Sequence, residues 1–192
     1  METEIKQLNR KEYKKVLNYE LFNNQKLPVF YKIRLKYFTP NTNCVFLARR
    51  MWYLYSQGGI RRALSRIIYI KILRRYGCCI YPNAKVGKGF RVAHPVGIVI
   101  GKCVIGENFF IYQNATVGAR RELEEIRGLS PSIGNNVTIC SNSIVIGKIT
   151  ISDNVIVGAN SVVLHDLEEE GTYVGKPCEK SEIVFSKKEK RT

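Results

Sequence analysis

Aliphatic residues recur at every sixth position through the second half of the chain. A period of six fits neither an α-helix nor an alternating strand, and it is typical of solenoids in which short strands and turns alternate. Three such units close a triangular coil, and successive coils stack at the ~4.8 Å spacing of neighbouring strands. The pattern therefore predicts a mainly β protein with a parallel β-helix over residues 79–178. The recurring residues are Ile80, Val86, Val92, then Val99, Ile105, Ile111, Val117, then Ile133, Ile139, Val145, Ile151, Val157 and Val163.

Two interruptions of this period predict special structure. One extra residue separates Val92 from Val99, around Ala93-His94-Pro95. Residues 118–132 form an excursion of 15 residues that a coil cannot absorb, so we expect a loop that leaves the prism. Long loops in regular solenoids are commonly functional.

The first third of the chain has a helical pattern instead. Four apolar segments, separated at Pro28, at Pro40 and at Gly58-Gly59, predict four short helices. The clearest is residues 59–76, where Ile60, Leu64 and Ile67 share one face and arginines occupy most of the other. The domain organisation predicted is a basic helical domain over 1–78, the β-helix over 79–178 and a polar tail over 179–192.

The formal net charge of +15 is concentrated in the helical region. Residues 1–78 hold 17 Lys and Arg against 4 Asp and Glu, together with eight of the eleven tyrosines and Trp52. Basic and aromatic side chains suit an acidic lipid interface, which predicts peripheral contact with a membrane, although a solvated basic face remains equally open. No nucleic-acid motif is present, and we expect no nucleic-acid partner.

No apolar run approaches the ~18 residues of a membrane span, and the first residues lack the apolar core of a signal peptide. The six cysteines show no CxxC spacing. We therefore expect reduced thiols, no metal, and a cytoplasmic protein that can associate with the inner face of the membrane. An acyl-cysteine mechanism at Cys78 or Cys79 would require a base and an electropositive pocket, and we disfavour it because small buried residues are the simpler interpretation of these cysteines.

Residues 79–178 resemble the serine O-acetyltransferase family and its relatives that acetylate sugars and capsular polysaccharides. The resemblance is carried by the segments IYPNAKVGKGFRVAHPVGIVIG, VIGENFFIYQNATVG, VIGKITISDNVIVGANSVV and YVGKPC, in that order, and covers about half the chain. It implies a left-handed parallel β-helix of hexapeptide repeats, a homotrimer with active sites between subunits, and acetyl-CoA as co-substrate.

The same resemblance implies that His94 is the catalytic base. Imidazole suits proton transfer at neutral pH because its unperturbed pKa lies nearby. Other family positions are changed: Ala93 replaces the aspartate that holds the serine amino group, and Cys79 replaces the aspartate that orients the histidine. Leu129 and Ser130 stand where an arginine and a second histidine are expected. His165 is given no role.

The resemblance also implies positions for acetyl-CoA, where small residues permit close approach and a lysine meets the phosphates. Backbone N–H groups near Gly118 and Ala119 can receive charge that develops on the thioester oxygen. The alternative is that these residues only satisfy the corners of the coil. The predicted cofactor-binding residues are Gly118, Ala119, Ser141, Ser143, Gly158, Ala159, Ser161 and Lys176.

The function predicted from these residues is acetyl transfer from acetyl-CoA to a hydroxyl, with a sugar of a surface polysaccharide as the preferred acceptor, either as a small molecule or linked to lipid. Free L-serine brings two charges whose usual partners are missing, and unpaired charges in a partly buried site are costly. L-Serine O-acetyltransfer nevertheless remains the alternative. A further alternative is a catalytically silent trimeric binding module whose helices contact a membrane.

Overall fold

The structure, a computed structural model, describes residues 8–121, 129–175 and 177–181. Four helices come first: α1 (Arg10–Phe22), α2 (Val29–Phe38), α3 (Pro40–Ser56) and α4 (Gly59–Tyr76). Asn9 caps α1, where its side chain accepts from the N–H groups of Lys11 and Glu12. None of the described helices combines the length and the hydropathy that crossing a bilayer requires.

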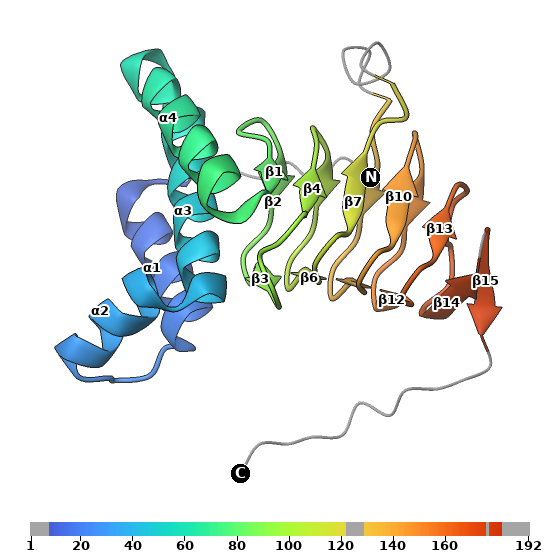
Figure 1. Ribbon diagram of the computed structural model, residues 1–192, viewed down its shortest axis with the longest axis horizontal. Coiled ribbons are helices and arrows are strands. Elements are labelled where there is room, and N and C mark those ends of the chain that lie inside the picture. Colours follow the sequence, from blue (N-terminus) through green and yellow to red (C-terminus); the bar gives the residue numbers. More distant parts are fainter. Residues whose placement is uncertain (1–7, 122–128, 176, 182–192) are drawn as a thin grey trace.

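The helices pack against one end of a left-handed parallel β-helix, which confirms the predicted fold class (Figure 1). Its three faces are parallel sheets with the orders β1-β4-β7-β10-β13 (face A), β2-β5-β8-β11 (face B) and β3-β6-β9-β12-β14 (face C). The strands are β1 (Cys79–Ile80), β2 (Lys85–Val86), β3 (Arg91–Val92), β4 (Val99–Ile100), β5 (Val104–Ile105), β6 (Phe110–Ile111), β7 (Thr116–Gly118), β8 (Ser132–Ile133), β9 (Thr138–Ile139), β10 (Ile144–Ile146), β11 (Thr150–Ile151), β12 (Val155–Val157), β13 (Val162–Val163) and β14 (Gly171–Gly175).

The predicted aliphatic positions form the core of the prism, with one exception. Val99 is only half-buried, whereas Ile100 is fully buried and pairs with Ile80 and Val117. The prediction of Val99 was wrong because Ile98, Val99 and Ile100 are all apolar, and only alternation along the strand decides which side chains point inward. The coil from Ile80 to Ile100 thus has two residues more than the regular coil from Val145 to Val163, not one.

Asparagines in the left-handed region turn two corners of the prism. At the corner between faces B and C, Asn108, Asn136 and Asn154 have φ values of 57°, 56° and 60°. Asparagine tolerates this conformation better than other side chains with a Cβ. The amides also pair along the stack, since Asn108 donates to Asn136 and Asn136 to Asn154, both at 3.0 Å. The repeat therefore fixes its own turn geometry at each coil.

An ion pair joins the helices to the first coil. Arg49 Nη2 lies 2.6 Å from Glu20 Oε1, and the two side chains are 4% and 0% exposed. Arg49 also donates to the carbonyls of Val86 and Gly87, while Glu20 accepts from the N–H groups of Gly89 and Phe90 at 3.0 Å. These backbone groups belong to the first coil, which has no preceding coil to pair with. Helices α1 and α3 thus satisfy a strand edge that would otherwise be open.

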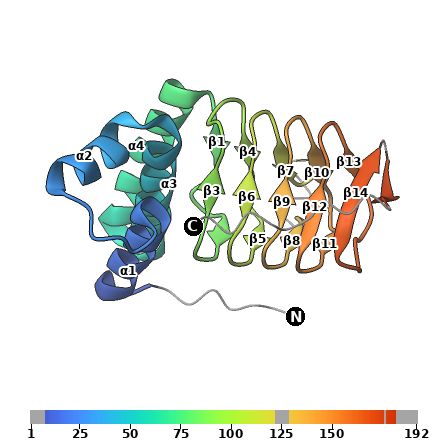
Figure 2. The same ribbon diagram turned by 90° about the horizontal axis from the view of Figure 1, so that it is seen from below.

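The other end of the prism is closed by a different device. Strand β15 (Cys178–Ser181) pairs antiparallel with β14, which is the last strand of face C (Figure 1). Figure 2 shows β14 at the end of the prism away from the helices. Each end of the β-helix is therefore covered by a segment that does not continue the hexapeptide repeat.

Candidate functional site

His94 lies on a bulged corner between β3 on face C and β4 on face A. In the next coil, Asn114 with φ of 56° is the third residue after β6, whereas Gly97 with φ of 63°, at the equivalent place in the first coil, is the fifth residue after β3. The two additional residues of this coil therefore fall within Ala93-His94-Pro95-Val96. Pro95 is buried, and Val96 N–H donates to His94 O at 2.9 Å, so the bulge is folded tightly and leaves the His94 side chain exposed.

The imidazole of His94 makes no hydrogen bond to any residue that the structure describes. Cys79, at the position where the family orients its histidine, interacts elsewhere. Its side chain lies near Tyr69 of α4, and burial, followed by the neighbouring Cys79 and Tyr81, raises the pKa of the Tyr69 hydroxyl. No group within the described part of the protomer orients His94, so that group would have to come from outside it.

Three predicted cofactor residues lie on the same corner of the prism as His94. Backbone hydrogen bonds at 2.9–3.0 Å stack Ala93 on Ile111, Tyr112 on Ile139 and Cys140 on Val157. Ser141 and Ala159 follow the stacked residues in their own coils. Ser141 is half-buried, and Ala159 is exposed. Three coil spacings separate His94 from Ala159, about 14 Å at ~4.8 Å each. We call the row of His94, Ser141, Gly158 and Ala159 the His94 corner.

Ser143 and Ser161 are placed differently. Both side chains are fully buried inside the prism, and Ser143 Oγ donates to Gly158 O at 2.8 Å. Their hydroxyls therefore do not face a ligand on the surface, and their small size serves the packing of the core. Ser161 Oγ has no hydrogen-bond partner among the described residues.

Gly118 and Ala119 lie at the next corner, between faces A and B, where the long loop leaves the prism. Gly118 O accepts from Gly147 N at 3.0 Å, and Arg120 Nη2 donates to Leu164 O at 3.3 Å. Face A thus separates this corner from the His94 corner. Lys176 and residues 122–128 of the loop lie outside the described residues.

The sequence analysis missed Gln113. It lies at the His94 corner in the second coil, where the backbone N–H of Asn142 donates to the backbone carbonyl of Gln113 at 3.1 Å. The side-chain Oε1 is buried and has no partner among the described residues, which is costly unless a ligand, a water or another subunit supplies a donor. A polar residue in a turn is ordinary, so the sequence alone carried no signal.

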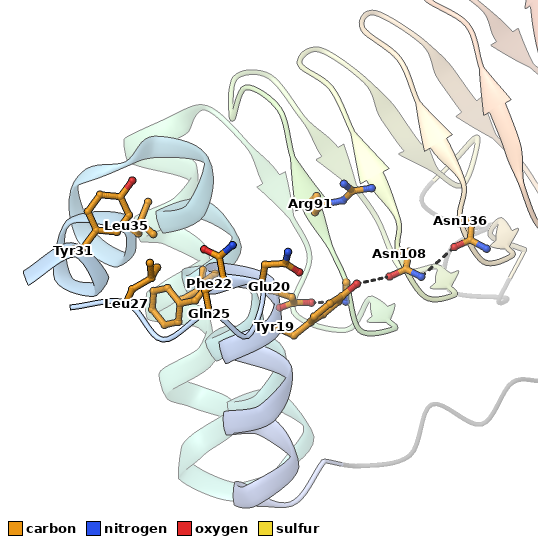
Figure 3. A pocket seen from close by; sticks show the side chains of 13 residues that line it. Tyr19, Glu20, Phe22, Gln25, Leu27, Tyr31, Leu35, Arg91, Asn108 and Asn136 are labelled. Atoms are coloured by element: carbon orange, nitrogen blue, oxygen red, sulfur yellow. Dashed lines mark hydrogen bonds between the residues drawn. The ribbon is translucent and has the colours of Figure 1, made fainter. Parts of the chain in front are cut away.

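Two hollows lie between the helices and face C, and only the smaller one reaches this corner. The larger, of about 610 Å³, is lined by aromatic and amide side chains, among them Tyr19, Tyr31 and Asn108 (Figure 3). A smaller hollow of about 240 Å³ shares Glu20 and Arg91 with it and reaches Ala93, next to His94. The Glu20 carboxylate is already paired with Arg49, so neither hollow offers a free carboxylate among its described lining residues. Arg91 lines both hollows and has no ion pair among the described residues, so the lining lacks a partner for an ammonium group but offers one for an anionic group.

Comparison with known proteins gives one consistent result. Serine acetyltransferase of Staphylococcus aureus is 44% identical over 102 residues, which cover 53% of this chain and 47% of that protein. The chain is related to the serine acetyltransferases. The solved serine acetyltransferase of Neisseria gonorrhoeae matches with a TM-score of 0.75 at 28% identity, covering 90% of this chain and 67% of that one. The soybean serine acetyltransferase matches with a TM-score of 0.74 at 29% identity, covering 88% and 69%.

Both the gonococcal and the soybean serine acetyltransferase have been solved with serine bound. No family model matches the chain. The chain spans about half the length of the serine acetyltransferases that it matches in sequence, 47% in the staphylococcal case.

Proposed function

We propose that this protein is an acetyl-CoA-dependent O-acetyltransferase with His94 as its general base. The observation that carries the proposal is the exposed His94 imidazole on a folded bulge, at the head of a corner lined by small residues. Its relationship to serine acetyltransferases supports the same reaction.

The chemistry requires one proton acceptor and no protein nucleophile. Neutral His94 takes the proton of the acceptor hydroxyl as its oxygen attacks the thioester carbon of acetyl-CoA. The carbon–sulfur bond breaks, and the imidazolium returns the proton to the departing thiolate. No cluster of His, Cys, Asp or Glu suited to a metal ion is found in the described part of the chain.

The proposal places the extended arm of acetyl-CoA along the small residues of the His94 corner. Ala159 is exposed there, so we expect Ala159→Trp to obstruct the arm and raise the KM for acetyl-CoA at least tenfold, a loss of about 1.4 kcal/mol of binding. Glu168→Trp places the same side chain at an exposed site beyond face B and should leave KM unchanged. Equal KM values for the two variants would contradict this placement of the co-substrate.

We propose a homotrimer whose active sites lie between subunits. The His94 ring has no orienting partner among the described residues of its own protomer, and Gln113 has an unpaired buried amide oxygen at the same corner. A neighbouring subunit could supply both partners, for which the loop 118–132 is a candidate. An active monomer in sedimentation would contradict this proposal.

Two acceptors are favoured by different observations. The names of the relatives favour L-serine over the sugar that the sequence analysis preferred. The uncharged Ala93 beside His94, and hollows without a free carboxylate among their described residues, offer no partner for the ammonium group of serine and so favour a sugar hydroxyl. We give L-serine the first place because the similarity spans the whole fold, and we retain a saccharide, soluble or lipid-linked, as the second candidate.

The test is thiol release from acetyl-CoA by the full chain, with L-serine and a panel of activated and lipid-linked sugars as acceptors. Release with L-serine alone establishes the serine enzyme and means that its charges have partners other than those the family uses. Release with a sugar alone establishes the glycan enzyme. No release with any acceptor, together with no binding of CoA, would support the catalytically silent module instead.

A further inference from the structure

Helix α4 exposes an apolar stripe that nothing in the described chain covers. Ile60, Leu64, Ile67 and Ile70 are 80%, 45%, 63% and 44% exposed. Their spacing of three and four residues places them on one face of the helix. The opposite face packs inward, where Ser65 and Ile72 are fully buried. The apolar face that the sequence pattern defined is therefore turned to the outside.

Unpaired basic residues lie beside this stripe and at its C-terminal end, where Lys71 and Arg74 follow Ile67 and Ile70 by four residues on the same face. Arg61, Arg66, Lys71 and Arg74 are all exposed, and none lies within salt-bridge distance of a carboxylate of the described residues. Between Glu20 and Glu107 the sequence contains sixteen Lys and Arg and no Asp or Glu. Figure 1 shows α4 at the end of the molecule away from β14 and β15, so the stripe lies at one end of the prism.

The charge distribution distinguishes the occupants that this face could have. A second copy of the same face would bring like charges together without any carboxylate to pair with them, which is unfavourable. Nucleic acid would pair with the arginines but would leave four large aliphatic side chains unused. An anionic bilayer fits both the basic and the aliphatic side chains, because acidic headgroups attract Lys and Arg while aliphatic side chains enter the acyl boundary.

We propose that the α4 stripe (Ile60, Leu64, Ile67 and Ile70 with the flanking Arg61, Arg66, Lys71 and Arg74) binds the surface of an anionic membrane. The helix lies along the interface and does not cross it. This proposal is independent of which acceptor the enzyme uses. It also assigns a role to basic residues that the proposed acetyl transfer does not require.

The test is sedimentation of the full chain with vesicles of phosphatidylcholine, with and without phosphatidylserine. We expect binding only to the anionic vesicles, weakened by added salt because surface charges are screened. Ile60→Ser with Ile67→Ser, and separately Arg66→Gln with Lys71→Gln, should each weaken binding roughly tenfold or more. Lys102→Gln with Lys148→Gln removes the same charge from exposed sites on the β-helix and should have a much smaller effect.

Two results would overturn the proposal. One is no sedimentation of the folded wild-type chain with anionic vesicles at low salt. The other is binding that the Lys102 and Lys148 changes weaken as much as the α4 changes do, which would mean that net charge alone attracts the protein. Self-association that Ile60→Ser with Ile67→Ser abolishes, without any vesicle binding, would assign the stripe to a second copy. Circular dichroism of each variant confirms that the helices remain folded.

Discussion

Replacing His94 with alanine is expected to lower the rate of acetyl transfer by about 10²–10⁴, the usual contribution of a positioned general base. The imidazole is exposed and makes no hydrogen bond within the described chain, so the melting temperature should change little. The measurement is thiol release from acetyl-CoA with whichever acceptor proves active, alongside thermal unfolding of the same preparations.

The chain supplies a matched control for this experiment. It has two histidines, and the other, His165, is also exposed, with Nδ1 3.1 Å from the carbonyl of Asp166. His165→Ala should keep full activity. If His94→Ala were as active as His165→Ala, the proposal that His94 is the general base would be wrong. Loss of activity accompanied by a large fall in melting temperature would instead indicate a structural role for His94.

The second large effect concerns stability. Arg49→Met should lower the free energy of unfolding by about 3–5 kcal/mol, because it leaves the buried Glu20 carboxylate without its cation. The substitution also removes the hydrogen-bond donor of the Val86 and Gly87 carbonyls. The measurement is urea unfolding, with wild type and variant at the same protein concentration since an oligomer's stability depends on it.

An exposed ion pair provides the comparison. Lys88 Nζ lies 3.1 Å from Glu107 Oε2, with the side chains 55% and 48% exposed. Lys88→Met should cost less than about 1 kcal/mol, as surface pairs generally do. Arg49→Lys keeps the charge but cannot reach every partner at once, so its cost should lie between the two. Similar costs for Arg49→Met and Lys88→Met would show that the helices are not held to the first coil in this way.

The fold could be predicted from sequence because its signals are local. Every third of a coil repeats the same inward aliphatic position, and the helix breaks at Pro28, Pro40 and Gly58-Gly59 are set by neighbouring residues. The register at Val99 and Ile100 could not be predicted, because both residues are apolar and the bulge before them changes the count. The family resemblance located His94, but the sequence does not say where its imidazole points.

Other features depend on contacts between residues distant in the chain. Glu20 and Arg49 are 29 positions apart, and nothing near either of them marks a buried pair. In α4 the amphipathic pattern was correct, yet the same pattern describes a face buried in a core and a face left open. Only the packing of α3 against Ser65 and Ile72 decides between them. The proximity of Tyr69 to Cys79 could not be predicted either, because the two residues lie on a helix and on the first strand.

The closed ends of the prism limit how the protein can be divided. A bare β-helix cut before β1 would present the N–H groups of Gly89 and Phe90 and the carbonyls of Val86 and Gly87 to any other chain with a free strand edge. Because β15 still covers the other end, two such prisms would pair through their open ends, as exposed strand edges do. The helical segment thus keeps the molecule discrete, and any shortened form intended for crystallisation or binding studies should retain α1 and α3.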